Sequence, residues 1–203
     1  MKLFFSPGAC SLAPHIALQE ANLAYEAMAA PTKTHTLADG TDYYTINPLG
    51  YVPLLVLDDG RQLREVQAIV QFIADLAPAS GLAPANGTYA RYKLQEWLSF
   101  IATELHKGCF AALFAPAMPA EGKEQAKTRL LARLQWLDAE LGSQPYLMGD
   151  TFTVADGYLF VVLNWGRLVG VDVSAFATLK AFMDQVRARP AVKAALRAEG
   201  LLK

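Results

Sequence analysis

The sequence of 203 residues predicts a mixed α/β part followed by an all-helical part. Three observations lead to this fold class. Short strand-like and helix-like runs alternate only in the first 77 or so residues, a stretch rich in Pro, Gly, Ala and Ser follows, and the spacing of apolar residues is helical from there to the end. A chain of this length forms one large or two small domains and can bury a core without disulfides.

The first part begins with a predicted strand, helix and strand. Residues 2–5 (KLFF) are apolar and strand-like, and residues 11–22 (SLAPHIALQEAN) have helical spacing with Asn22 near the C-cap. Residues 23–30 are a second candidate strand. A less defined stretch separates this β-α-β unit from the next apolar run.

A hairpin and a helix complete the first part. The apolar run 52–57 precedes Asp59-Gly60, a good hairpin turn, and a short partner strand. The segment EVQAIVQFIADLAP, residues 65–78, is helical with its apolar residues on one stripe. The order β-α-β then β-β-α is the thioredoxin pattern, so we predict a thioredoxin-like α/β domain over residues 1–77, with its reactive site where the first strand meets the first helix.

The second part is predicted to be an all-α domain over residues 88–203, joined by a linker at 78–87. Long helices are expected at 89–114 and 124–141, and three shorter ones follow. In DTFTVADGYLF a Thr stands three residues before an Asp, ahead of an apolar run. This capping box, Thr153 and Asp156, is a structural signal in which each side chain satisfies a backbone N–H at the helix start.

Charge and cysteine content limit the possible functions. With 18 basic and 19 acidic residues and no basic stripe, the chain is not expected to bind nucleic acid. Its two cysteines, at 10 and 109, form no disulfide framework and no metal motif, which fits a reducing cytosol. The apolar start breaks at residues 6–8, and no window approaches the ~20 apolar residues of a membrane span. We therefore expect a cytoplasmic protein without metal or membrane partners.

One cysteine has an unusual position. In FFSPGACSLAPH, Cys10 follows a Pro-Gly turn and opens the first helix. A helix N-terminus carries roughly +0.5 charge and free N–H donors, which favour a thiolate. If the pKa fell from ~8.5 to ~6.5, the thiolate fraction at pH 7 would rise from about 3% to about 75%. The local sequence leaves two interpretations open, a reactive or ligand-facing thiol and a small buried apolar residue.

Five segments, in this order and spacing, resemble the cytosolic glutathione S-transferases of the bacterial beta type, whose active-site position is cysteine. The segments are MKLFFSPGACSLAPHIAL, INPLGYVPLLVLDDG, EVQAIVQFIAD, EWLSFIATELHKG and FTVADGYLF. The resemblance covers the whole chain. It implies a thioredoxin-like domain plus an all-α domain, glutathione as co-substrate, a homodimer, and a role in detoxification.

The resemblance also implies residues that bind glutathione. Val52, before a cis Pro53, would pair its N–H and C=O with the cysteinyl part of the tripeptide as an added strand does. Glu65 would pair with the ammonium of the γ-glutamyl end, and it would also suit a helix N-terminus by its charge. Val66 would offer its backbone N–H, although relatives usually carry a small or hydroxylated residue there.

Four further positions carry expectations from the same resemblance. His35, with Lys33 nearby, stands where beta-type relatives usually carry lysine for the glycyl carboxylate; a solvated loop histidine is the alternative. His106 is expected to face the cleft between domains, where it would donate to a sulfur anion or move a proton, although a lone helical histidine is usually structural. Ser99 and Thr103 would line the same cleft or reach the partner subunit's glutathione.

The resemblance allows two roles for Cys10 in catalysis. Cys10 either attacks a disulfide as a thiolate or donates a hydrogen bond to the thiolate of glutathione, and Ser11 is a second donor. Cys109 is expected to pack, with a resolving thiol as the alternative. The predicted function is conjugation of glutathione to small electrophiles in an apolar pocket beside Phe4, Phe5, Phe110 and Phe114. The alternatives are a glutathione-dependent thiol-disulfide reductase or dehalogenase acting through Cys10, and a non-catalytic ligand-binding protein.

Overall fold

The computed structural model describes residues 1–203, and the chain divides into two compact units. The first contains residues 1–83 and 189–203, and the second contains residues 84–188. The end of the chain therefore folds with the first unit, although the sequence assigned everything after residue 88 to the helical part. The ranges 1–77, 78–87 and 88–203 stay predictions of domain boundaries.

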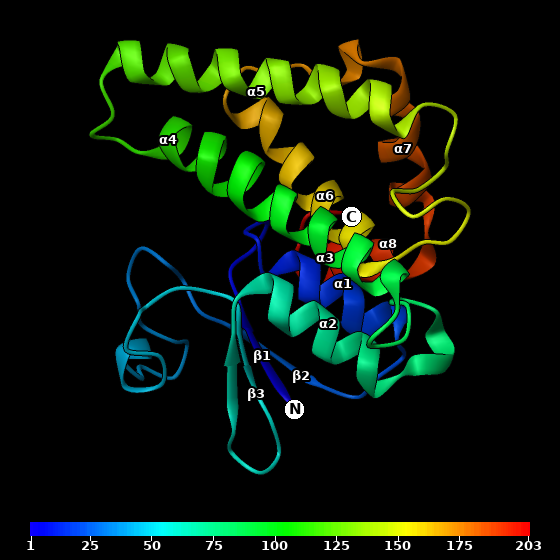
Figure 1. Ribbon diagram of the computed structural model, residues 1–203. Coiled ribbons are helices and arrows are strands. Elements are labelled where there is room, and N and C mark those ends of the chain that lie inside the picture. Colours follow the sequence, from blue (N-terminus) through cyan, green and yellow to red (C-terminus); the bar gives the residue numbers. More distant parts are fainter. The chain divides into compact units, whose positions relative to one another are not determined.

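The first unit is built on a four-stranded sheet. Its strands are β1 (Lys2–Phe5), β2 (Glu26–Ala29), β3 (Leu54–Val56) and β4 (Gln62–Arg64), in the order β2-β1-β3-β4 (Figure 1). The central strand β1 runs parallel to β2 and antiparallel to β3, and β3 and β4 form the predicted hairpin. With helices α1 (Leu12–Glu20) and α2 (Val66–Leu76), the order of elements is the one that the sequence predicted.

The alternation of side chains along β1 determines what covers each face of the sheet. Phe5 lies against the ring of His15 on α1, with 5.5 Å between ring centroids. Phe4 points the other way and packs against Tyr43, also at 5.5 Å, in a buried cluster with Leu37, Val52 and Leu54. The two phenylalanines are buried in the core of this unit.

The C-terminal helix α8 (Pro190–Ala198) packs on α1 in the same unit. The carboxylate of Glu199, directly after α8, lies 2.9 Å from Nδ1 of His15, and both side chains are almost fully buried. The second carboxylate oxygen of Glu199 accepts a hydrogen bond from the backbone N–H of Gly8, also at 2.9 Å. The end of the chain thereby holds the loop that carries Cys10.

Replacing Glu199 with alanine is expected to lower the free energy of unfolding by about 3 kcal/mol, because it leaves the buried ring of His15 and the partly buried N–H of Gly8 without this acceptor. Glu199→Gln keeps one acceptor oxygen and should cost less. Glu96→Gln is the matched control, since its ion pair with Lys93 is exposed and is worth less than about 1 kcal/mol. Urea unfolding measures all three, and a loss for Glu199→Ala no larger than that of the control would contradict the expectation.

The second unit is helical and contains no named strand. The predicted long helix 89–114 is one continuous helical run, and the other main helices are α5 (Ala120–Leu141), α6 (Val154–Asn164) and α7 (Ala177–Ala188). The run consists of α3 (Tyr89–Phe100), the π-helix η3 (Ile101–Phe110) and α4 (Ala111–Phe114). The 3₁₀ segments of the chain are η1 (Tyr43–Thr45), η2 (Pro78–Ser80), η4 (Trp165–Leu168) and η5 (Val173–Ala175). None of the helices is both long and apolar enough to cross a bilayer.

The predicted capping box at the start of α6 is confirmed. Asp156 accepts hydrogen bonds from the backbone N–H of Thr153 at 2.7 Å and from its hydroxyl at 2.9 Å, and the Thr153 side chain caps α6 in return. The other carboxylate oxygen of Asp156 accepts from the N–H of Leu147 at 2.8 Å. Because α6 is buried along almost its whole length, this box anchors the centre of the second unit.

Candidate active site

The loop between β1 and α1 positions Cys10. Ser11 is fully buried, and its hydroxyl accepts from the N–H of Ser6 at 3.1 Å and donates to the Ser6 carbonyl at 3.3 Å. A backbone turn from Ala9 to Leu12 then leads into α1. The Ser11 hydroxyl therefore holds the loop, and its predicted role as a donor to sulfur stays a prediction.

Cys10 is partly exposed just before α1, and its Sγ lies 3.4 Å from the carbonyl oxygen of Val52. In this contact the thiol donates to the carbonyl, as only the protonated form can. The structure thus brings together two of the residues predicted to meet glutathione. The thiolate state of Cys10 stays a prediction.

A cis peptide bond and two side-chain hydrogen bonds hold the segment INPLGYVP, residues 46–53. The Val52–Pro53 peptide bond is cis, as the resemblance implied. The carbonyl of the preceding Tyr51 accepts from the hydroxyl of Tyr43 at 3.1 Å and from the side-chain amide of Asn47 at 2.8 Å. Asn47 is fully buried, so its hydrogen bond to the Tyr51 carbonyl is shielded from water. These two hydrogen bonds hold the backbone directly before Val52, the residue that contacts Cys10.

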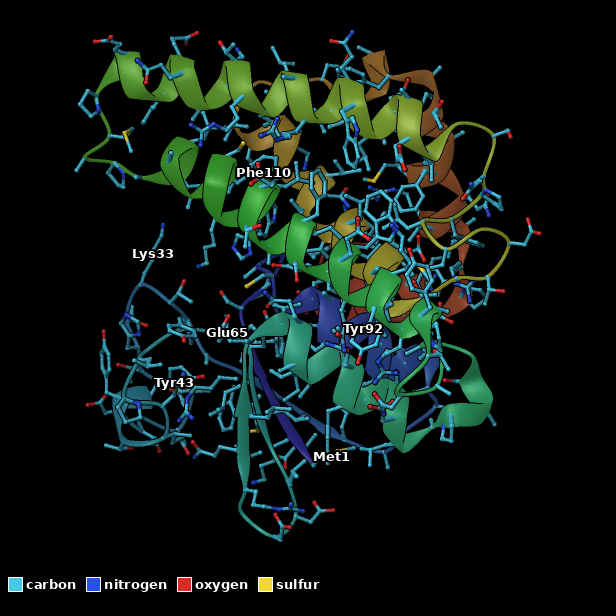
Figure 2. All side chains as sticks on the ribbon, in the orientation of Figure 1. Met1, Lys33, Tyr43, Glu65, Tyr92 and Phe110 are labelled. Carbon is cyan, nitrogen blue, oxygen red and sulfur yellow. The ribbon has the colours of Figure 1, made fainter.

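His35 lies in the loop between β2 and η1, where its ring packs against Tyr44 with 4.5 Å between centroids. Its φ is +54°, and its Nδ1 is buried without a hydrogen-bond partner. Figure 2 shows Lys33 extended from the same loop, which also leads to Tyr43. His35 is therefore half-buried against an aromatic ring, and its contact with a glycyl carboxylate stays a prediction.

Glu65 and Val66 form the start of α2 (Figure 2). Glu65 has φ +67°, a conformation that costs an L-residue about 1–3 kcal/mol and is found mainly at functional sites. Its exposed carboxylate stands at the helix N-terminus, where the helix dipole favours a negative charge. The side chain of Val66 is buried, so only its backbone N–H remains for a ligand.

Tyr51 is a site residue that the sequence reasoning missed. Its hydroxyl donates to the Glu65 carboxylate at 3.1 Å. Burial and the neighbouring carboxylate raise the pKa of Tyr51, so that it remains a donor at neutral pH. Its place directly before Val52 in the sequence was the only available signal.

In the second unit, His106 lies in the π-helical segment η3. A Cβ at Gly108 would collide with the carbonyl oxygen of Thr103, and the thiol of Cys109 donates to the carbonyl of Glu104 at 3.1 Å. Both pairs are five residues apart, which is the π-helical repeat. Glycine in ELHKG thus permits the wider turn beside His106, and such turns are frequent at functional sites.

Two aromatic side chains of the second unit contact the ring of His106. Its Nδ1 lies 2.8 Å from the hydroxyl of buried Tyr158, and its ring centroid lies 4.9 Å from that of Trp165. Burial, with a smaller contribution from the charge of Lys107, lowers the pKa of His106 to about 4. The imidazole is therefore neutral at pH 7, and when Nδ1 accepts from Tyr158 the proton is on Nε2, where it can be donated. The sequence analysis did not predict that Tyr158 or Trp165 contacts His106.

The remaining predicted residues of the second unit lie along the same helical run. Ser99 and Thr103 are exposed and one turn apart, and the Thr103 hydroxyl donates to the Ser99 carbonyl at 2.9 Å. Phe110 is buried and Phe114 is half-exposed, and both rings contact Trp165. Because these residues belong to the second unit, their approach to Cys10 stays a prediction.

Cys109 is completely buried, and burial raises the pKa of its thiol. These two properties support the packing role over that of a resolving thiol. The structure contains no group of three or more His, Cys, Asp or Glu side chains arranged to hold a metal ion.

The low pKa of His106 predicts how stability depends on pH. The folded protein binds fewer protons than the unfolded chain between pH 6.5 and about 4, so this group's contribution is fully present above pH 6.5 and is lost as the pH falls through about 4. Relative to His106→Gln, the wild type should lose about 3 kcal/mol of unfolding free energy across this window. Chemical unfolding of both proteins at pH 7, 5.5 and 4 measures this loss. If the free energy of unfolding changed with pH in the same way in both proteins, the lowered pKa of His106 would be contradicted.

Comparison with known proteins shows which family combines a sheet unit and a helical unit of this kind. Family models described as "Glutathione S-transferase, N-terminal domain" and "Glutathione S-transferase, C-terminal domain" match residues 8–76 and 93–190. Glutathione S-transferase GstA of Escherichia coli O157:H7 is 43% identical over 99% of this chain and all of its own length. The chain belongs to the glutathione S-transferase family.

Solved structures agree with this assignment. The beta-class glutathione S-transferase of Sphingomonas chungbukensis is 48% identical with a TM-score of 0.95, and the similarity covers both chains completely. A sphingomonad glutathione S-transferase complexed with glutathione is 49% identical with a TM-score of 0.94, over 99% of this chain and all of the other. The predicted family, its bacterial beta type and the fold class are confirmed.

Proposed function

We propose that this glutathione transferase conjugates glutathione to small hydrophobic electrophiles, and that it is cytoplasmic and homodimeric and serves detoxification. The observation that carries the proposal is the 3.4 Å contact between the Cys10 sulfur and the Val52 carbonyl. It places a sulfur beside a backbone segment suited to pair with a peptide. The glutathione bound to the similar sphingomonad enzyme supports this choice of co-substrate.

Each polar group of glutathione has its own partner in the protein. The backbone of Val52 pairs with the cysteinyl residue, and the Glu65 carboxylate pairs with the ammonium while the Val66 N–H donates to the adjacent carboxylate. His35, with Lys33 on the same loop, receives the glycyl carboxylate. The ring of His35 also packs against Tyr44, with 4.5 Å between the ring centroids.

The chemistry depends on stabilising the sulfur of glutathione as a thiolate. When the N–H of bound glutathione occupies the Val52 carbonyl, the Cys10 thiol is free to donate to that thiolate instead. His106, neutral and hydrogen-bonded to Tyr158, supplies a second donor, the N–H of its Nε2. Glutathione releases its thiol proton to solvent when it forms the thiolate. The thiolate then attacks the electrophilic carbon, a C–S bond forms, and the leaving group departs with its electron pair.

Retention on immobilised glutathione tests the proposal. The wild type should be retained and should conjugate an aryl halide. Cys10→Ser should keep retention but lose most of the conjugation, and the matched variant Cys109→Ser should match the wild type at both, provided that it folds. Faster disulfide exchange than conjugation, abolished by Cys10→Ser, would instead indicate the reductase alternative. A folded wild type that is not retained would refute both activities.

A further inference from the structure

An arginine of β4 reaches the segment that precedes Val52. Arg64 donates from Nε to the side-chain oxygen of Asn47 at 2.9 Å and from Nη2 to the side-chain oxygen of Gln62 at 2.7 Å. Both acceptors are neutral, so neither of them balances the charge of the half-buried guanidinium. The binding of glutathione proposed above uses neither Arg64 nor Asn47, although Arg64 stands directly before Glu65 in the sequence.

The hydrogen-bond partners of Asn47 fix the orientation of its side-chain amide. The oxygen and the nitrogen of an amide have similar shapes, so the partners decide which way the group points. A guanidinium can only donate, and a carbonyl can only accept. The amide oxygen therefore faces Arg64, and the amide nitrogen donates to the Tyr51 carbonyl at 2.8 Å. Since Asn47 is fully buried, water does not compete for these hydrogen bonds.

The Tyr51 carbonyl belongs to the same planar peptide unit as the N–H of Val52. In a trans unit the C=O and the N–H point in opposite directions. The carbonyl accepts from Asn47 and from the hydroxyl of Tyr43, which is labelled in Figure 2, so the N–H of Val52 points away from these two donors. This N–H has no hydrogen-bond partner within the chain. It is the donor that the proposed binding offers to the cysteinyl carbonyl of glutathione.

The same hydrogen bonds connect a positive charge to the N–H of Val52. Arg64 donates to Asn47, and Asn47 donates to the Tyr51 carbonyl, which shares its peptide unit with that N–H. In a chain of this kind each hydrogen bond polarises the next. The charge of Arg64 therefore makes the N–H of Val52 a stronger donor, and the geometry of the chain aims it.

We propose that Arg64 and Asn47 are positioning residues of the glutathione site, which aim and polarise the N–H of Val52 toward the cysteinyl carbonyl of the tripeptide. Neither side chain touches glutathione itself. The inference rests on the proposed pairing of Val52 with glutathione. It adds that β4, which leads directly to Glu65, and the segment before Val52 act as one unit, so the γ-glutamyl and cysteinyl parts of glutathione are bound at a fixed separation.

Arg64→Met in the full chain tests the proposal, because it removes the donors and the charge but keeps an unbranched side chain. The KM for glutathione should rise about tenfold with kcat almost unchanged, since the lost interaction binds the ground state and the transition state equally. Arg64→Lys retains the charge and a donor, and should stay within about threefold of the wild type. Arg61→Met is the matched control: this arginine pairs with Asp59 at the exposed hairpin turn, and its loss should leave the KM unchanged.

An analogue of glutathione separates positioning of Val52 from general damage to the site. γ-Glutamylcysteamine lacks the cysteinyl carbonyl and the glycine but keeps the γ-glutamyl group for Glu65. Its dissociation constant, measured by calorimetry, should be the same for the wild type and Arg64→Met. An equal loss for the analogue and for glutathione would overturn the proposal, because Arg64 would then act on the γ-glutamyl end or on the whole site. An unchanged KM for glutathione in Arg64→Met would overturn it as well.

Alkylation of Cys10 gives a measurement that does not need glutathione. The Cys10 thiol donates to the Val52 carbonyl, so releasing this segment should weaken the contact and make alkylation by iodoacetamide at pH 7 about threefold faster in Arg64→Met. Mass spectrometry of the Cys10 peptide gives the rate. A rate equal to that of Arg61→Met would overturn the proposal. Faster alkylation in a protein that does not bind glutathione would refute the proposed function and still support the positioning of Val52 by Arg64.

Discussion

Replacement of Asp156 with alanine is expected to lower the free energy of unfolding at pH 7 by about 3 kcal/mol. The change removes half of the capping box of α6, which is worth about 1 kcal/mol. It also leaves the buried N–H groups of Thr153 and Leu147 without their acceptor, which costs about 1–3 kcal/mol for each group. Part of this free energy is recovered, because the substitution also removes a buried negative charge. Urea unfolding followed by circular dichroism gives the value.

Two variants serve as controls for this prediction. Asp156→Asn retains an acceptor oxygen and should lose less than Asp156→Ala. Asp172→Ala removes an aspartate with similar local hydrogen bonds, to Ser174, but in an exposed turn, and should lose less than about 1 kcal/mol. An Asp156→Ala protein as stable as Asp172→Ala would show that the box does not hold α6.

The loss at Asp156 should depend on pH. Burial raises the pKa of this carboxyl to about 6 from 3.8, so the folded protein binds more protons than the unfolded chain between these values. The part of the stability that is linked to this raised pKa is therefore fully present below pH 3.8 and is lost as the pH rises through about 6, while the hydrogen bonds of the box remain. The difference between wild type and Asp156→Ala should be larger at pH 4.5 than at pH 7. His106, whose pKa is lowered, acts in the opposite direction over the same range.

Local signals in the sequence predicted much of the fold. The alternation of strands and helices up to residue 77, the Asp-Gly hairpin and the Thr153–Asp156 box each depend on residues a few positions apart. The position of Cys10 between β1 and α1 follows from the same local pattern. The cis bond before Pro53 did not follow from local chemistry, since most such bonds are trans, and came from the family resemblance.

Contacts between distant residues could not be predicted in this way. The pairing of His15 with Glu199 joins residues 184 positions apart, and it places the last helix in the first unit. Tyr158, 52 positions after His106, forms the hydrogen bond to Nδ1 of the imidazole. The π-helical turn needed Gly108, but a glycine within a helical pattern does not by itself indicate a wider turn.

The Glu65 carboxylate gives the largest expected effect on glutathione binding. Glu65→Gln should raise the KM for glutathione by about 50-fold with little change in kcat, because a charged hydrogen bond to the ammonium is worth about 1.5–3 kcal/mol. The variant should also discriminate less between glutathione and its analogue without the amino group. Glu26→Gln, at an exposed glutamate of the same unit, should leave both quantities unchanged. Retained discrimination in Glu65→Gln would place the ammonium elsewhere.

Under the proposed binding of the ammonium by Glu65, we expect Tyr51 to act on it only through that carboxylate, and a double-mutant cycle tests this. Tyr51→Phe removes the 3.1 Å hydrogen bond that orients the carboxylate and should raise the KM for glutathione by about fivefold. In the Glu65→Gln background the same change should have almost no effect, because the carboxylate that it orients is absent. Tyr44→Phe is the matched control, since its hydroxyl makes no hydrogen bond in the structure. Additive effects of Tyr51→Phe and Glu65→Gln would mean that Tyr51 contacts the tripeptide directly.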